Sequence, residues 1–237
     1  MHRTGRGRIA GASVVWLIAT SLAAAEPAHL VAARDLLAHV APVDTNYEHH
    51  RGRVVWGSAS KRYECHTDCS GLLNHLLEHA YGITDGDLRG WLGTSRPTAK
   101  TFHEAIEKEN RFLRIKHVPD MRPGDVIAVR YPANSENTGH VMIVAEAPRP
   151  HPPSDPLRNG ALQWAVAVID SSMSGHGLQD TRRKADGSFR DGLGQGVLRL
   201  YTDPQGAIAG HTWSTFGNSD FHSQSDRHVE VGRLNLK

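Results

Sequence analysis

The order of hydrophobic patterns along the chain constrains its fold more than any other feature. Apolar residues recur at helical spacing in three segments of the first half, residues 27–41, 67–80 and 96–110. Runs that predict strands follow in the second half, at residues 122–131, 139–147, 164–170, 196–201 and 227–234. Helices followed by consecutive strands indicate an α+β fold, in which N-terminal helices pack on an antiparallel β-sheet.

The length of the chain is compatible with one domain. The 237 residues are ordinary for a globular protein in their hydrophobic (39%) and charged (22%) fractions, and no internal repeat is visible. The proline-rich segment 148–156 separates two predicted strands, and we interpret it as a surface loop rather than a domain boundary. We therefore expect a single domain over residues 26–237.

Residues 1–25 have the pattern of a secretory signal peptide. Arginines near the start precede an uncharged apolar run at 9–23, and small residues end the segment at Ala25. A membrane anchor is the alternative, but a spanning helix needs about 20 apolar residues. We expect cleavage after Ala25 and export to the periplasm or the extracellular space, with no stable membrane anchor.

Charge and aromatic content exclude some partners. Loss of residues 1–25 removes three arginines and no acids, so the 27 lysines and arginines fall to 24 against 25 acidic residues, a net charge of about −1. We expect no nucleic-acid partner, because no basic face survives the cleavage. An aromatic fraction of 6% does not favour a large aromatic binding platform.

Both cysteines lie in "YECHTDCSGLLNHLL", residues 63–77. A disulfide between Cys65 and Cys69 would close a very short loop and stabilise little. A metal site that adds His66 would lack the second, distant pair of ligands found in structural zinc sites. We favour Cys65 as an idle second thiol, followed by a disulfide that masks Cys69 at rest.

Cys69 has the sequence setting of a nucleophile. Thr67 or Asp68 can cap a helix that begins there, and a leucine stripe from Leu72 onward would bury the helix and hold the sulfur in place. A thiol reacts as the thiolate, which the N–H groups and dipole of a helix N-terminus stabilise. A plain buried thiol is the alternative.

The predicted strands offer a base and an orienting group. His140 opens the strand 139–147, where the sheet fixes its backbone and its side chain is open to a cleft. Asp170 ends the next apolar strand, and antiparallel pairing puts the start of one strand beside the end of the other. We expect Asp170 to hold the His140 imidazole in the tautomer needed by a base for Cys69.

Several short motifs resemble those of the NlpC/P60 group of papain-like cysteine peptidases. They are "DCSGLL", "RPGDVIAV", "GHVMIVAE" and an apolar strand ending in a polar residue, in this order over residues 45–172. The resemblance implies a papain-like α+β fold with Cys69 as nucleophile, His140 as base and Asp170 at the third polar position. It also implies cleavage of peptide bonds in bacterial cell-wall stems, often next to a D-amino acid.

The chain departs from that family upstream of the cysteine and at the third polar position. Val54 stands where family members often carry a tyrosine, and Tyr47 or Tyr63 could supply that hydroxyl. Asp170 replaces a more frequent histidine, a change that the chemistry tolerates because a carboxylate orients imidazole well. The segment from residue 173 on lies outside the motifs that match.

Further polar and aromatic side chains are candidates for binding the substrate. His176, with Asp180, Arg182 and Arg183, either lines the cleft and binds a substrate carboxylate or belongs to a solvated basic loop. The residues expected at the substrate-binding cleft are Tyr47, Trp56, Tyr63, Ser70 and His176.

The residues and the resemblance together predict a cysteine hydrolase of amide bonds, with peptidoglycan stem peptides as the first substrate to test. Cys69 attacks, His140 transfers the proton, and backbone N–H groups at the helix start stabilise the oxyanion, without a cofactor. Two other classes stay open. One is an amidase or an acyl- or amide-transferring enzyme on the same scaffold. The other is a non-catalytic cell-wall-binding protein whose thiols are oxidised or metal-bound.

Overall fold

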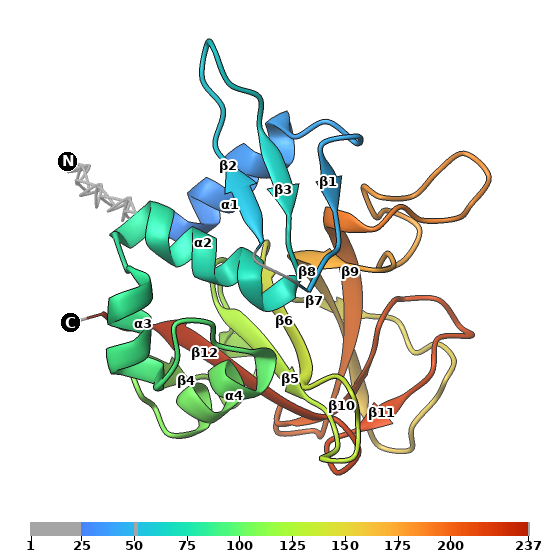
Figure 1. The fold of residues 1–237 in the computed structure, drawn as a ribbon. Coiled ribbons are helices and arrows are strands. Elements are labelled where there is room, and N and C mark those ends of the chain that lie inside the picture. Colours follow the sequence, from blue (N-terminus) through green and yellow to red (C-terminus); the bar gives the residue numbers. More distant parts are fainter. Residues whose placement is uncertain (1–24, 50–51, 237) are drawn as a thin grey trace, which may run out of the picture.

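The computed structural model describes residues 25–49 and 52–236. Helices lie on one side of a large β-sheet, next to a small sheet (Figure 1). In the described ranges the helices are α1 (Ala28–His39), α2 (Cys69–Tyr81), α3 (Asp85–Leu92), α4 (Ala99–Glu107) and a 3-10 turn at Val118–Asp120. Each of these is too short or too polar to cross a bilayer. The predicted signal segment lies outside the described residues, apart from Ala25.

The strands form two sheets. The small sheet consists of β1 (Thr45–Asn46), β2 (Arg53–Val55) and β3 (Glu64–His66), in the order β1-β3-β2. The large sheet consists of β4 (Phe112–Arg114), β5 (Val126–Arg130), β6 (Gly139–Val144), β7 (Arg149–His151), β8 (Leu162–Ser172), β9 (Gly192–Thr202), β10 (Ile208–Thr212), β11 (His222–Ser223) and β12 (His228–Leu234). Its order is β11-β10-β9-β8-β6-β5-β12-β4, with β7 paired to β8, and all pairs are antiparallel.

The centre of the large sheet is buried on both faces. On one face, side chains such as Ile143 pack in a core with the leucine stripe of α2, including Leu76. On the other face, Val129 and Val168 belong to a second core that includes Val118 from the 3-10 turn. Strands covered on both faces have near-continuous apolar sequences, which is why β5 and β6 do not alternate.

The structure confirms the α+β prediction and corrects three of its details. Helix α3 lies where the sequence predicts the end of a helix, because Gly86 and Gly90 weaken its pattern; a capping box of Thr84 and Asp87 starts it. The segment 148–156 is not only a loop, since β7 pairs with β8. The small sheet was not predicted, because its strands have only two or three residues each.

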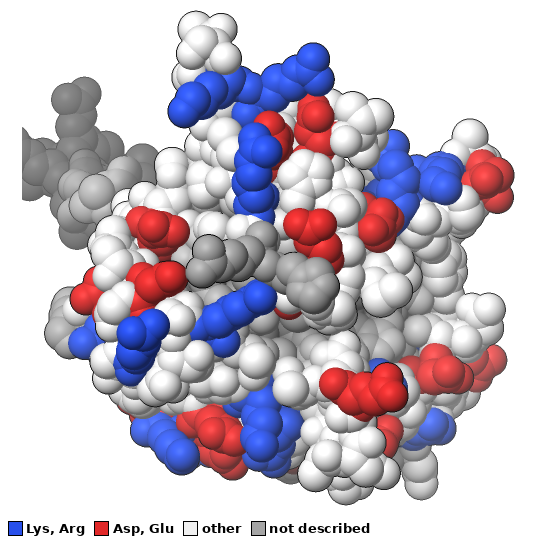
Figure 2. Space-filling model, in the orientation of Figure 1, with Lys and Arg blue, Asp and Glu red and all other residues white. Residues whose placement is uncertain are grey.

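Charged side chains of both signs share the surface. Figure 2 shows lysine and arginine side chains interspersed with acidic ones over the described residues of one face. Near the small sheet, for example, Arg53 pairs with Glu64 at 2.7 Å, and Arg62 lies 3.9 Å from Asp44. The nearly balanced charge of the sequence is thus also mixed in space on this face.

Candidate active site

Cys69 is the first residue of α2. Asp68 caps the helix: its carboxylate accepts the Gly71 N–H at 2.7 Å and the Ser70 hydroxyl at 3.1 Å. A Cβ on Gly71 would lie 2.1 Å from the Thr67 hydroxyl oxygen, so glycine lets the helix begin this close to the preceding chain. The sulfur therefore lies where helix N–H groups and the helix dipole favour the thiolate.

One buried hydrogen bond connects the start of α2 to β8. The Ser171 hydroxyl donates to the carbonyl oxygen of Thr67 at 2.6 Å. Asp170 directly precedes Ser171, and Cys69 follows Thr67 by two positions. The bond therefore fixes the strand that carries the carboxylate relative to the helix that carries the thiol.

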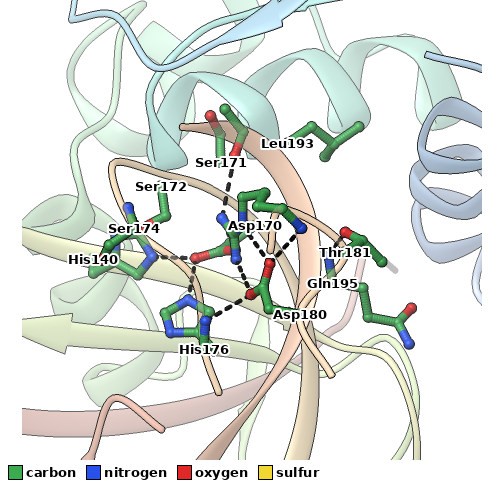
Figure 3. Close-up of polar contacts among 12 residues, drawn as sticks. His140, Asp170, Ser171, Ser172, Ser174, His176, Asp180, Thr181, Leu193 and Gln195 are labelled. Atoms are coloured by element: carbon green, nitrogen blue, oxygen red, sulfur yellow. Dashed lines mark hydrogen bonds and ion pairs between the residues drawn. The ribbon is translucent and has the colours of Figure 1, made fainter. Parts of the chain in front are cut away.

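His140 is placed by the start of β6. Gly139 before it has a φ of 144°, and a Cβ there would lie 1.9 Å from the Val129 carbonyl oxygen, so only glycine fits. β6 pairs antiparallel with β8. Nε2 of His140 lies 2.6 Å from Oδ2 of Asp170 (Figure 3). The predicted juxtaposition of His140 and Asp170 is confirmed.

The electrostatics of His140 suit a pair with the thiolate. Because Nε2 bonds Asp170, Nδ1 is the ring nitrogen available for the hydrogen bond between His140 and Cys69. Burial by itself lowers the pKa of His140, but the negative charge of Cys69 and the bond to Asp170 outweigh it and raise the pKa to about 10. An imidazolium at His140 favours the thiolate opposite it, and the thiolate is the reactive form of a cysteine nucleophile.

Tyr47 lies beside the sulfur, just after β1. Its N–H donates to the Asp191 carboxylate at 3.0 Å, and its hydroxyl hydrogen-bonds Cys69. Burial and the nearby negative charges of Cys69 and Asp68 hold the pKa of Tyr47 well above its usual range, so the hydroxyl keeps its proton. Of the two tyrosines considered from the sequence, Tyr47 and not Tyr63 supplies a hydroxyl to the site.

Two hollows meet at Cys69 and His140. The larger, about 570 Å³, lies over the start of α2 and is mostly polar. The smaller, about 180 Å³, lies beside His140 and is partly aromatic. Both are bordered by Tyr47 and Asn137. The larger also contacts His49, Ser70, Thr98 and Glu136, and the smaller contacts Tyr131, Met173, His176 and Trp213.

The two cysteines have different environments. Cys65 lies on β3 with its side chain fully buried in the core beneath the helices. Burial raises the pKa of its thiol to about 12. Both cysteines are free. This arrangement favours the idle-thiol interpretation of Cys65 over a disulfide with Cys69.

Metal ligation by Cys65, His66 and Cys69 gains no support from the geometry. In the part of the chain that the structure describes, two sets of His, Cys, Asp or Glu side chains are close enough to share an ion. These sets are His140–Asp170–His176 and His103–His228–Glu230. Neither contains a cysteine.

Tyr63 and Trp56 do not lie at the cleft, so both predictions are wrong. The Tyr63 hydroxyl donates to Asp35 on α1 at 3.2 Å. The Trp56 indole N–H donates to the Ala32 carbonyl at 3.2 Å, and its ring stacks on His79 with centroids 3.9 Å apart. The physical reason is that the chain around β2 and β3 packs against α1 and α2, away from Cys69.

Asp170 has two further close partners besides His140. Nε2 of His176 lies 2.8 Å from Oδ2 of Asp170, and Nη1 of Arg182 lies 3.0 Å from Oδ1. Arg182 also binds both oxygens of Asp180, at 2.9 and 2.7 Å. Burial by itself raises the pKa of Asp170, but the charges of Arg182 and His176 outweigh it and hold the pKa well below its usual range. Asp170 is therefore an ionised carboxylate.

His176 borders the smaller hollow, as one interpretation expected, but its contacts contradict a role in binding a substrate carboxylate. Its side chain is buried and faces Asp170, so it does not offer a free group to a substrate carboxylate. The interpretation as a solvated basic loop holds only for Arg183 among the four residues considered, because His176, Asp180 and Arg182 are buried. Sequence reasoning missed Arg182 as a partner of Asp170, and Asp180 as the second carboxylate that Arg182 binds.

A glycine pattern could have revealed this network. The sequence "GLGQG", residues 192–196, lies inside β9, where glycine normally weakens a strand. A Cβ on Gly194 would lie 2.4 Å from Nε of Arg182, and one on Gly196 would lie 2.3 Å from Oδ2 of Asp180. The glycines leave the space that the two charged side chains fill.

Comparison with known proteins identifies a viral relative. No family model matches the chain, and no solved structure matches it. Uncharacterized protein R653 of Acanthamoeba polyphaga mimivirus is 34% identical over 223 residues, which cover 89% of this chain and 98% of the viral protein. Because the similarity extends over nearly all of both chains, the protein belongs to the family of the mimivirus protein R653.

Proposed function

We propose that the protein is a cysteine hydrolase of the papain-like NlpC/P60 type that cleaves amide bonds, with peptidoglycan stem peptides as the substrate class. One observation carries the proposal. The thiol of Cys69 begins a buried helix beside His140, whose far nitrogen is bonded to the ionised Asp170 at 2.6 Å. A nucleophile, a base and an orienting carboxylate in this order are the groups needed for acyl transfer through a thioester.

The first half-reaction follows from the charges of the pair. The Cys69 thiolate attacks the carbonyl carbon of the scissile amide, and a C–S bond forms as the carbonyl becomes an oxyanion. The His140 imidazolium then donates its Nδ1 proton to the amide nitrogen. The C–N bond breaks, the amine leaves, and a thioester joins the acyl group to Cys69.

The second half-reaction restores the enzyme. Neutral His140 takes a proton from water, and the hydroxide oxygen attacks the thioester carbon. The C–S bond breaks and releases a carboxylic acid, leaving the thiolate and the imidazolium. Asp170 keeps Nε2 of His140 protonated in both steps, so that Nδ1 is the nitrogen that exchanges protons.

Two groups can stabilise the oxyanion. The N–H groups of Cys69 and Ser70 belong to the first turn of α2, where helix geometry provides no preceding carbonyl for them. The Tyr47 hydroxyl keeps its proton beside the sulfur, and this single O–H can turn from the sulfur to the oxyanion once the C–S bond has formed. Donors held in place before the reaction lower the barrier because they need not reorient.

The cleft suits an extended polar chain. The larger hollow beside Cys69 has charged and hydroxyl-bearing walls, whereas the smaller one beyond His140 presents Trp213 and Tyr131. A peptide laid across Cys69 would meet polar side chains on both sides of the scissile bond, with aromatic rings added on the His140 side. This arrangement agrees with a substrate made of short peptides.

Digestion of purified peptidoglycan under reductant tests the proposal. The wild type should produce new peptide termini, read by mass spectrometry, and Cys69→Ala should lower kcat by on the order of 10⁶, the loss seen when a catalytic nucleophile is removed. Cys65→Ala is the matched control, because it removes a buried thiol four positions away. It should keep kcat and lose about 1 kcal/mol of stability.

The result can contradict the proposal in two ways. Equal activity of Cys69→Ala and the wild type would exclude Cys69 as the nucleophile. Absence of product from the wild type, on peptidoglycan and on a panel of other amides, would contradict the hydrolase. Transfer of the acyl group to an added amine in preference to water would instead identify a transferase on the same scaffold.

A further inference from the structure

Both ring nitrogens of His176 face hydrogen-bond acceptors. Nδ1 lies 2.8 Å from the carbonyl oxygen of Trp213, and Nε2 lies 2.8 Å from Oδ2 of Asp170. A carbonyl oxygen and an ionised carboxylate can only accept, so each nitrogen must carry a proton. This geometry requires the imidazolium form.

A second proton on His176 balances the charges of the buried cluster. Asp170 and Asp180 contribute two negative charges, and Arg182 contributes one positive charge. The Cys69–His140 pair is neutral in sum whether its proton lies on the sulfur or on the ring. A cationic His176 therefore supplies the missing positive charge, and burial makes an unbalanced charge costly.

The backbone holds His176 in this position. Its N–H donates to Oδ2 of Asp180 at 2.6 Å, and Asp180 in turn is bound by Arg182. The glycines 194 and 196 of β9 leave room for these side chains. These contacts hold the connection between β8 and β9 against the two strands that it joins.

We infer that His176 is a positioning residue that carries a proton on both ring nitrogens and, with Arg182, keeps Asp170 ionised and directed at Nε2 of His140. This gives the site a second imidazolium, 6.2 Å from the first between ring centroids, that exchanges no proton with substrate. Its protonation follows from contacts within the protein alone. Its effect on catalysis rests on the proposed function.

The groups that face His176 set the expected pH response. They are Asp170 on β8, Asp180 and Arg182 between β8 and β9, His140 on β6 with Cys69 on α2 beyond it, and His211 on β10 beyond Trp213. Removing a positive charge favours the protonated form of every neighbouring group. Loss of the His176 charge should therefore make the Cys69 thiolate form at higher pH.

The rate of Cys69 alkylation by iodoacetamide, measured against pH, tests this effect without a substrate. In His176→Asn the midpoint should move up by about 1 pH unit, the size expected for one charge roughly 10 Å away at an effective dielectric constant of ~20. A purely structural role would lower the amplitude and leave the midpoint in place. An unmoved midpoint would overturn the positioning role.

His29→Asn is the matched control. His29 is as buried as His176, and both of its ring nitrogens are hydrogen-bonded, to the Tyr81 hydroxyl and the Gly124 carbonyl. The variant loses similar packing at a distance from Asp170, so its midpoint should equal that of the wild type. An equal shift in both variants would overturn the inference, because general destabilisation would then explain it.

Nitrogen-15 NMR of the intact wild type keeps the inference testable if His176→Asn does not fold. At pH 7 the assigned His176 ring should show two protonated nitrogens. One bare nitrogen would overturn the inference. The two proposals can fail separately. If the NMR spectrum shows a doubly protonated His176 but Cys69 reacts no faster than a free thiol, the proposed hydrolase is contradicted and the inferred protonation of His176 still holds.

Discussion

Two clusters of this protein have nearly the same composition and opposite electrostatics. The Asp170 cluster is His140, Asp170, His176 and Arg182. The Glu230 cluster is His103, Glu230, His228 and Arg114, on α4, β12 and β4. Each contains two histidines, one carboxylate and one arginine, yet only the first lies beside a thiol at a helix start.

The buried histidines of the two clusters titrate in opposite directions. Nε2 of His140 bonds a carboxylate, and its pKa is raised to about 10 despite burial. Nε2 of His103 instead bonds Nδ1 of His228 at 2.8 Å. Burial, followed by the charges of Arg130 and its other cationic neighbours, lowers the pKa of His103 to about 3.

The partner of the carboxylate explains this difference. Asp170 gives one oxygen to both of its histidines and the other to Arg182. Glu230 uses both oxygens for Arg114 and lies 3.6 Å from its nearest histidine nitrogen. A histidine–carboxylate–arginine set is therefore no sign of catalysis by itself, because the contacts decide whether a histidine is charged.

The largest expected difference between the two clusters is in kcat, after replacement of one histidine in each. His140→Gln removes the proposed base and should lower kcat by roughly 10²–10⁴-fold, the contribution typical of general acid–base catalysis. His103→Gln should leave kcat unchanged, because His103 is remote from the thiol. Initial rates on the same peptide substrate measure both. A comparable loss in the two variants would contradict the assignment.

The next largest difference is expected when the carboxylate of each cluster is replaced, and it concerns the free energy of unfolding. Asp170→Asn removes the buried carboxylate that His140 and His176 share, although Arg182 keeps Asp180, and should cost about 3–5 kcal/mol in the free energy of unfolding. Glu230→Gln should cost about 1 kcal/mol, because the Arg114 side chain is 33% exposed and water can solvate it. Urea denaturation measures both values. Equal losses in the two variants would show that the contacts of Asp170 contribute nothing to the free energy of unfolding beyond the effect of its burial.

The smallest effect should be a contrast in pH dependence. The pKa of His140 is raised above its ordinary 6.5, so its stabilisation is complete below pH 6.5 and is lost as pH rises toward about 10. The pKa of His103 is lowered, so its neutral form stabilises the fold above pH 6.5, and this is lost as pH falls toward about 3.

The two glutamine variants measure this contrast. Plots of Tm against pH should flatten on the alkaline side for His140→Gln and on the acidic side for His103→Gln, relative to the wild type. The same change in both plots would mean that neither histidine carries the charge assigned to it.

Local sequence was enough to predict the elements that carry the proposed chemistry. The leucine stripe and the Asp68 cap predicted α2 with Cys69 in its first turn, because both signals act within one helical turn. The apolar runs predicted β6 and β8, and their antiparallel pairing placed Asp170 beside His140. These predictions needed only periodicity and strand direction.

The sequence by itself determined the α+β class, the helix start at Cys69 and the strands that bring His140 to Asp170. Only the tertiary structure decided that Tyr47 and not Tyr63 reaches the sulfur, that Trp56 stacks on α2, and that His176 and Arg182 bind Asp170. The physical reason is the distance along the chain over which each effect acts. Caps, turns and periodicity act between near neighbours in the chain, whereas burial and charge pairing depend on segments that meet only when the sheet has formed.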